Sequence, residues 1–289
     1  PVVGPKDGFR HIVYALTGRL LADCSIATFT YYFDIYRKQY WPEMLDFLGV
    51  REDQLPALCE PCSNAGALLP EVAARLGVNE NVLVNIGTLD HFAGMIGTGN
   101  VRPGTLSLST GTVLGLSTMA GDPVKRDTGI PMHYGFLPGT YVMLPTAESG
   151  GASLEWFRKA FLPETSYRQI DEQAALRRPG DLLFLPYIVG TNAPEFDLDA
   201  CGMFYGLRSK HDAFDLALAV MEGVAHLLKK NCDMILASGT PIERIIATGG
   251  GAKSALWCQL QADITGIPVS IPAEKEAACL GAAMIGATS

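Results

Sequence analysis

The spacing of apolar and polar residues changes several times along this chain, and each change predicts a helix or a strand. Polar and apolar positions alternate over 105–109 and again over 112–116, a pattern typical of a β-hairpin with a tight glycine turn. Segments 133–136 and 141–144 indicate a second hairpin. Apolar residues at helical spacing predict helices over 8–25, 41–49, 69–76, 90–95, 149–161, 165–177 and 211–236.

The remaining segments predict strands and a loop between these helices. Short apolar runs at 82–86 and 182–185 are typical of buried strands, and the Pro-, Asp- and Asn-containing segment 190–202 predicts a loop. The block 243–289 follows the order strand, helix, strand, helix. Hairpins mixed with β-α-β units predict an α/β fold with a mixed sheet.

Three consecutive glycines, Gly249 to Gly251, lie between the predicted strand 242–248 and an amphipathic helix. Glycine has no Cβ, so a flat ligand can approach the main chain there, and the next helix presents free N–H groups to an anion. Each ordered glycine also costs conformational entropy, which argues against a plain helix-entry turn. The pattern therefore predicts a nucleotide site.

Composition excludes several classes of protein. The net charge is −8 and no Lys/Arg-rich run occurs, so we expect no nucleic-acid partner. No apolar stretch is long enough to span a bilayer, so we expect no membrane partner. An odd number of cysteines, 7, fits reduced thiols in the cytoplasm. The single C-x-x-C pair, Cys59 and Cys62, is interpreted as two incidental thiols, and His133 and His226 as structural residues, so no metal ligand is predicted.

Three known nucleotide-binding motifs can be compared with the glycine bend. The bend does not match a P-loop, because Ala252 precedes Lys253-Ser254 where that motif needs glycine. A dinucleotide fingerprint is partly satisfied, which leaves a dinucleotide-dependent oxidoreductase as an alternative. The third interpretation combines the bend with Asp90 and the hairpin tip 110–112 in one site. Asp90 would be a base, the hairpin tip would donate to phosphate oxygens, and the bend would hold the adenosine. Phosphoryl transfer from ATP to an alcohol needs these three parts.

Each of these residues also has a structural interpretation. Asp90 follows a strand and begins a helix, so it could serve as a general base, as an N-cap, or as both. His91 beside it could reach a substrate or lie partly buried in the helix. The hairpin tip taken alone is a turn, and Asp197 and Asp199 are more typical of turns than of a metal or sugar site.

Motifs along nearly the whole chain resemble the FGGY carbohydrate kinases, and most closely the pentulose kinases of that family. The segment Tyr14–Gly18 with Asp23 and Asp34 is similar to the end of the family's first domain. The motifs that carry the rest of the resemblance are Gly87-Thr88-Leu89-Asp90-His91-Phe92-Ala93-Gly94, Ser109-Thr110-Gly111-Thr112, Gly150-Gly151-Ala152-Ser153-Leu154-Glu155-Trp156, Leu185-Pro186-Tyr187, the 249–257 run, and Glu276-Ala277-Ala278-Cys279-Leu280-Gly281-Ala282-Ala283.

The resemblance implies two ribonuclease H-like domains around a cleft, as in actin-like ATPases, with 1–86 the C-terminal part of domain I and 87–289 the nucleotide-binding domain II. It implies ATP and Mg²⁺ as cofactors and a sugar as substrate, a ketopentose such as xylulose or a related polyol. The resemblance implies that Asp90 is the general base and that Asp90 and His91 contact the sugar. The implied ATP contacts are Thr110, Gly111, Thr112, Gly151, Glu155, Gly250, Gly251, Ala252 and Ser254.

The chain also departs from the family pattern. It has no match to the acidic strand and Asp-x-Gly-Thr hairpin that open the family's first domain, and Cys201 stands where the family usually has arginine. The chain begins at Pro1 without methionine, so we expect it to be part of a longer protein. A non-catalytic, actin-like nucleotide-binding module therefore stays as a second alternative. The sequence leaves the oligomeric state open, with a homodimer as one outcome.

Overall fold

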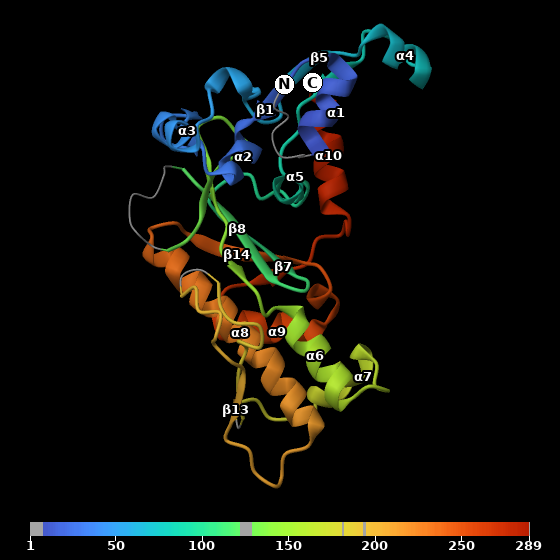
Figure 1. Cartoon of the computed structure of the whole chain (residues 1–289). Coiled ribbons are helices and arrows are strands. Elements are labelled where there is room, and N and C mark those ends of the chain that lie inside the picture. The colour runs from blue at the N-terminus through green and yellow to red at the C-terminus, as the bar shows by residue number, and fades with distance from the viewer. Residues whose placement is uncertain (1–7, 122–128, 181, 193–194, 289) are drawn as a thin grey trace.

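The computed structural model describes residues 8–121, 129–180, 182–192 and 195–288. The smaller, upper part in Figure 1 holds most of the N-terminal elements and the C-terminal helix, and the larger part is built around one sheet. The N-terminal elements are α1 (Gly8–Thr17), β1 (Leu21–Asp23), α2 (Cys24–Ala27), η1 (Thr28–Thr30), β2 (Phe33–Asp34), β3 (Gln39–Tyr40), α3 (Pro42–Leu48), η2 (Glu52–Gln54), β4 (Ala57–Cys59), β5 (Asn64–Ala67), α4 (Pro70–Leu76), β6 (Leu83–Asn85) and α5 (Asp90–Gly97).

The N-terminal strands form small two-stranded sheets. β1 pairs with β4 in parallel, whereas β2 with β3 and β5 with β6 are antiparallel. The predicted helix over 8–25 is wrong in its second half. The helix ends at Thr17 because Gly18 takes a left-handed conformation (φ 71°), and Asp23 then caps α2 by accepting from the N–H groups of Ser25 and Ile26.

The larger part contains a seven-stranded mixed sheet with the order β15-β14-β7-β8-β10-β9, in which β11 also pairs with β8. β14 is parallel to both β7 and β15, while β7, β8, β10 and β9 are antiparallel neighbours. Both predicted hairpins and the mixed sheet are confirmed. The strands are β7 (Gly104–Thr110), β8 (Leu114–Ala120), β9 (Met132–Tyr134), β10 (Tyr141–Met143), β11 (Thr146–Ala147), β14 (Ile242–Thr248) and β15 (Val269–Ser270).

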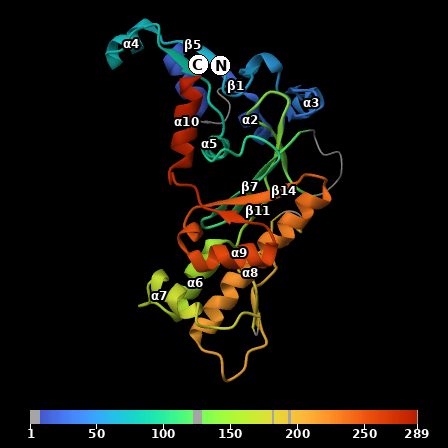
Figure 2. The ribbon, with the colours of Figure 1, turned by 180° about the vertical axis from the view of Figure 1, so that it is seen from behind.

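Helices cover this sheet on the side away from the smaller part (Figure 2). The long helix α8 begins at a capping box formed by Asp212 and Asp215, and it packs against α9, where the Trp257 indole donates to the Met221 carbonyl at 3.0 Å. Leu106 and Leu116 of the hairpin are fully buried in the core beneath them. The further elements are α6 (Gly151–Phe161), α7 (Tyr167–Ala174), β12 (Leu183–Leu185), β13 (Met203–Tyr205), α8 (Ala213–Ala237), η3 (Gly251–Lys253), α9 (Ala255–Thr265) and α10 (Ala277–Ala287).

Helix α10 returns to the smaller part and crosses α5, as both views show. The crossing is very close because both helices carry glycine there. A Cβ atom on Gly97 would lie 1.9 Å from the Ala277 carbonyl oxygen, and one on Gly281 would lie 1.8 Å from that of Ala93. Since the first residues of α5 and the segment before α10 lie beside β7 and β14, this crossing helps to hold them together over the sheet.

Candidate functional site

Asp90 is the first residue of α5, and its side chain is exposed. Its carboxylate accepts from the N–H of the next residue, His91, at 2.7 Å. An acidic group in the first turn is also stabilised by the helix dipole. The N-cap interpretation of Asp90 is therefore wrong, since Leu89 holds the N-cap position and no side chain caps the helix there. The Asp90 carboxylate is exposed beside the first turn of α5.

A cleft with a volume of about 290 Å³ opens beside Asp90. It is bounded by the first turns of α5, the inner end of β7, the end of β14 and the segment that leads into α10. The residues lining it are Asp90, His91, Gly94, Met95, Thr98, Ser107, Ser109, Thr248, Gly249, Lys275, Glu276, Ala277 and Ala278. The structure thus places the predicted base and the start of the glycine bend in one crevice, although they lie far apart in sequence.

The glycine bend packs directly on the hairpin tip. Gly249 takes a left-handed conformation (φ 79°), and a Cβ atom there would lie 3.0 Å from the Thr110 carbonyl oxygen. A Cβ atom on Gly251 would lie 2.6 Å from the Thr110 methyl group. Thr248 Oγ1 donates to the Leu108 carbonyl at 3.1 Å, which joins the ends of the two parallel strands. Glycine is required here because two stretches of main chain approach within van der Waals contact.

The start of α6 closes the other side of the hairpin tip. The N–H of Gly151 donates to the Gly111 carbonyl at 2.7 Å, and that of Ala152 donates to the Thr112 carbonyl at 3.1 Å. These two helix N–H groups are therefore engaged by the hairpin. Glu155, one turn further along α6, forms an ion pair with Lys159. The hydrogen bond from Lys159 lowers the pKa of the Glu155 carboxyl. Residues of all three predicted ATP segments thus lie around Thr110 to Thr112.

Ser254 is buried and caps α9, accepting from the Trp257 N–H at 3.0 Å. Asp171 of α7 is hydrogen bonded to Ser254, while burial raises the pKa of the Asp171 carboxyl. Sequence reasoning missed Asp171, because α7 lies well before the glycine bend in sequence and its pattern indicates only an amphipathic helix.

His91 points into the sheet. Its Nε2 lies 2.9 Å from the Ser117 hydroxyl on β8, and burial lowers the pKa of the imidazole below its usual value. The ring also forms part of the cleft lining. His91 is thus a partly buried residue that joins α5 to the sheet, which is the structural alternative considered for it.

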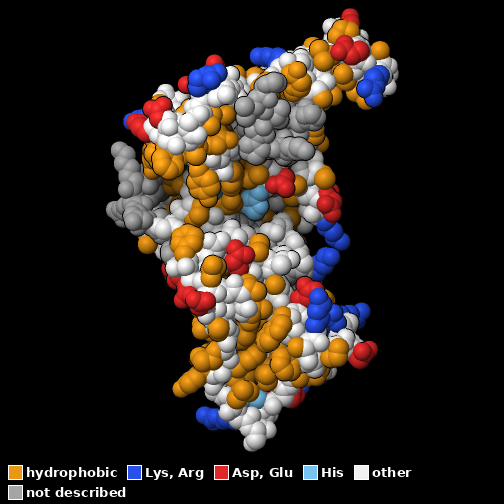
Figure 3. All heavy atoms as spheres, in the orientation of Figure 1, with side chains coloured by type: hydrophobic (Ala, Val, Ile, Leu, Met, Phe, Trp, Pro, Cys, Tyr) orange, Lys and Arg blue, Asp and Glu red, His pale blue; other side chains and the backbone are white. Residues whose placement is uncertain are grey.

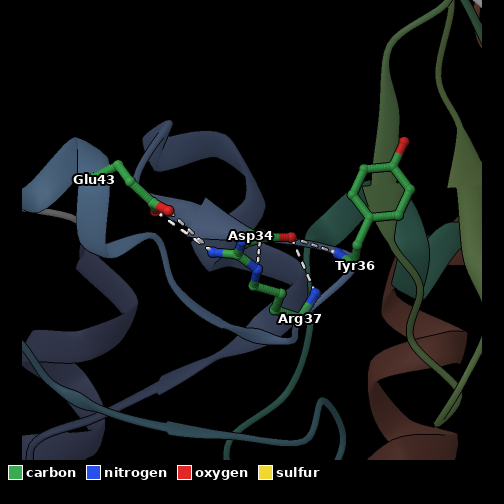
Figure 4. A network of polar contacts seen from close by, with 4 residues as sticks. All are labelled: Asp34, Tyr36, Arg37 and Glu43. Atoms are coloured by element: carbon green, nitrogen blue, oxygen red, sulfur yellow. Dashed lines mark hydrogen bonds and ion pairs between the residues drawn. The ribbon is translucent and has the colours of Figure 1, made fainter.

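Asp23 and Asp34, the two aspartates that belong to the sequence resemblance before Asp90, lie outside this cleft lining. Asp23 is buried as the cap of α2, and Ser25, which it binds, contacts the Thr88 hydroxyl at 2.8 Å. Asp34 accepts from the N–H groups of Tyr36 and Arg37, closing the turn between β2 and β3 (Figure 4). Both aspartates therefore stabilise local turns.

The remaining candidates show no sign of metal binding. Cys59 and Cys62 are free thiols, and burial raises the pKa of both, that of Cys62 to about 11. Asp197 accepts from the Asp199 N–H at 2.9 Å, as a turn former does. Within the described residues, no group of three or more His, Cys, Asp or Glu side chains could hold a metal ion, and no helix is long and apolar enough to cross a membrane.

The fold and the cleft define a ribonuclease H-like, actin-like domain with a carboxylate facing a glycine-bounded crevice. Family comparison agrees: the C-terminal domain of the FGGY family of carbohydrate kinases matches residues 105–289, and its N-terminal domain matches 9–97. The chain belongs to the FGGY family of carbohydrate kinases.

Individual relatives support this assignment. The xylulose kinase of Bacillus subtilis (strain 168) is 31% identical over 288 residues, covering 98% of this chain and 57% of its own length. A crystal structure of a "xyloylose kinase" from Brucella ovis superposes with a TM-score of 0.90 at 31% identity, over 96% of this chain and 58% of that one. The gluconate kinase of Lactobacillus acidophilus gives 0.88 at 26% identity, over 96% and 57%. The chain thus spans little more than half the length of these relatives.

Proposed function

We propose that the protein transfers the γ-phosphoryl group of ATP to a hydroxyl of a sugar, with Asp90 as the general base. The observation that carries the proposal is the cleft that Asp90 shares with Ser109 of β7 and with Gly249, the first glycine of the bend. Membership of a carbohydrate kinase family supports it, whereas neither an oxidoreductase nor a non-catalytic nucleotide module finds support among the relatives. The xylulose kinases among them favour a ketopentose such as xylulose, or a related polyol.

The chemistry follows from these positions. The Asp90 carboxylate takes the proton of the sugar hydroxyl, and the oxygen forms a bond to the γ-phosphorus while the bond to the ADP oxygen breaks. His91, anchored on Ser117, holds the first turn of α5 against the sheet.

The nucleotide contacts remain those predicted from the sequence: Thr110, Gly111, Thr112, Gly151, Glu155, Gly250, Gly251, Ala252 and Ser254. The packing of the glycine bend and of α6 on the hairpin tip supports their assignment to one site. Because the Gly151 N–H already binds the Gly111 carbonyl, we assign the phosphate contacts to the hairpin and the bend rather than to that N–H.

Mg²⁺ is the cofactor we propose beside ATP. This ion keeps several waters and usually binds one or two carboxylates together with substrate phosphates, so a cluster of three protein ligands is not required. Glu276, the carboxylate that lines the cleft in addition to Asp90, is suited to hold it through water. When bound, the ion would neutralise negative charge on the nucleotide.

We also propose that 1–86 and 87–289 belong to separate domains. Two small clusters agree with this division, since Ile86 is buried with Val13 and Leu21, whereas Phe92 is buried with Met119 and Phe136. The main core crosses it, because Cys24, Ala27 and Phe33 are buried there together with residues of the large sheet. The seven cysteines are all free thiols, which supports a cytoplasmic location.

A homodimer stays a prediction. Apolar side chains gather on one face of the larger part (Figure 3). Trp156 of α6 and Met203 and Tyr205 of β13 are exposed. Sedimentation velocity on the protein and on a Met203→Glu variant would test this face, since a charge there should lower any dimer fraction.

The function is tested by a coupled assay of ADP release with a panel of ketopentoses, polyols and sugar acids. We expect one ketopentose to be the best acceptor, and Asp90→Asn to lower kcat by about 10²- to 10⁴-fold while ATP affinity is kept. Asp53→Asn, a change at an exposed carboxylate paired with Arg51, is the control and should leave turnover unchanged. Near-normal turnover by the Asp90 variant would remove this residue from the mechanism.

A further inference from the structure

The cleft beside Asp90 contains an unequal set of charges. Among its described lining residues Asp90 and Glu276 are acidic, and Lys275 is the only one that carries a positive charge at neutral pH. A phosphoryl group that approaches two carboxylates is repelled unless a cation lies nearby. Lys275 is exposed, so its ammonium group is free to turn toward a ligand in the cleft.

The opposite wall offers a hydroxyl donor. Ser107 on β7 is buried and lines the cleft, and Asn100 behind it is completely buried. Asn100 Nδ2 lies 2.9 Å from Ser107 Oγ and 3.2 Å from the carbonyl oxygen of Ser117. A carbonyl can only accept a hydrogen bond, so the amide nitrogen must be the atom that faces both partners. The Asn100 amide therefore donates to Ser107 Oγ.

This direction leaves the Ser107 proton available. A serine hydroxyl has one proton to donate, and its oxygen here already accepts from Asn100. Among the described residues no acceptor for the Ser107 proton is found. A buried hydroxyl that lines a cleft and is fixed from behind by an amide is a preorganised donor toward a ligand.

We propose that Lys275 and Ser107 bind the γ-phosphoryl group of ATP in this cleft, on the side facing Asp90. The inference rests on the proposed phosphoryl transfer and names two further residues for it. The ammonium group of Lys275 neutralises charge on the phosphoryl oxygens, and the Ser107 hydroxyl donates to one of them. Both act while the phosphorus leaves the ADP oxygen and bonds to the sugar oxygen.

Comparing ATP with ADP isolates this contact, because the two nucleotides differ in the γ-phosphoryl group. Calorimetric titration of the purified protein should show that Lys275→Met weakens ATP binding about tenfold or more while ADP affinity stays within about twofold. Lys275→Arg keeps the charge and should restore most ATP affinity. Ser107→Ala should have the same selectivity with a smaller loss, and Ser107→Thr, which keeps the hydroxyl, should recover it.

Lys229→Met is the matched control, since Lys229 is paired with Asp233 on α8 and lies outside the cleft lining. Equal loss of ATP and ADP affinity in Lys275→Met, or no loss, overturns the inference even if the unaltered protein phosphorylates a sugar. Selective loss of ATP affinity in a protein that phosphorylates no sugar supports the inference and rejects the proposed function alone. Failure of the unaltered protein to bind ATP overturns both.

Discussion

The imidazole of His91 reaches across from α5 to the Ser117 hydroxyl on β8, with 2.9 Å between Nε2 and Oγ. The residue next to the proposed base is therefore anchored in the sheet. Removing the ring would leave the Ser117 hydroxyl without this partner and would let the first turn of α5 shift. We expect His91→Ala to lower kcat about tenfold or more with little change in the KM for ATP, because small displacements of a catalytic group are costly.

His91→Gln separates this positioning role from direct contact with the sugar. A glutamine amide can still reach toward Ser117, so we expect part of the lost kcat to return. Steady-state kinetics with the best acceptor provide the measurement. A large rise in the KM for the sugar at normal kcat would instead show that His91 binds the substrate, as the sequence suggested.

Gly250 and Gly251 differ in the room around them, which gives a second prediction. A Cβ atom on Gly251 would lie 2.6 Å from the Thr110 methyl group, whereas one on Gly250 would lie 3.7 Å from the Thr110 carbonyl oxygen, an ordinary contact. We expect Gly251→Ala to lower the free energy of unfolding by about 1–3 kcal/mol and to weaken ATP binding. Gly250→Ala should keep normal stability.

Because Gly250→Ala should leave stability unchanged, a change in the ATP affinity of this variant would report on contact between the bend and the nucleotide. If adenosine lies against the bend, the added methyl group should weaken ATP binding without any change in the midpoint of urea unfolding. Normal ATP affinity in a stable Gly250→Ala variant would place the nucleotide elsewhere.

Much of this fold can be predicted from the local spacing of apolar and polar residues. The prediction is wrong where a single residue interrupts that spacing. The hairpin over 105–116 was predictable because alternation and a glycine turn agree. The helix over 8–25 was overextended, because apolar spacing continues past Gly18 while the main chain takes a left-handed turn there.

The site was predictable only in part. Asp90 and the glycine bend each carry a local signal, whereas Ser107 and Lys275 do not: one is an ordinary polar position of a strand, the other a surface lysine. Their common cleft depends on the crossing of α5 and α10, which is set by tertiary contacts between Gly97 and Ala277 and between Gly281 and Ala93.

Burial of His133 gives a prediction about pH. Its ring stacks on Phe29 with 4.2 Å between centroids, and burial lowers its pKa from 6.5 to about 4. The unfolded chain therefore binds a proton more readily than the folded one between these values. Stability from the neutral ring is fully present above pH 6.5 and is lost as the pH falls toward 4, by roughly 3 kcal/mol in the limit.

Urea unfolding at pH 7 and pH 4.5 measures this loss. His133→Gln cannot titrate, so we expect its stability to fall less between the two pH values than that of the unaltered protein. His91, whose pKa is also lowered by burial, remains in both proteins and cancels in the comparison. The same pH dependence in both would show that His133 is not the group responsible.

Gly281 and Gly286 both lie in α10 and offer the sharpest test of the helix crossing. A Cβ atom on Gly281 would lie 1.8 Å from the Ala93 carbonyl oxygen, so Gly281→Ala must push α10 away from α5. Gly286 has open space around it, and alanine there should stabilise the helix by up to about 1 kcal/mol. We expect Gly281→Ala to destabilise the protein by about 1–3 kcal/mol or more.

The two substitutions add the same methyl group to the same helix, so helix propensity contributes equally and only the contact with α5 differs. Because α5 begins at Asp90 and the segment before α10 carries Lys275, separating the helices should also widen the cleft and lower kcat. Thermal unfolding and turnover of both variants provide the measurement. If Gly281→Ala is as stable and active as Gly286→Ala, the close crossing is not what sets the distance between the base and the residues that face it.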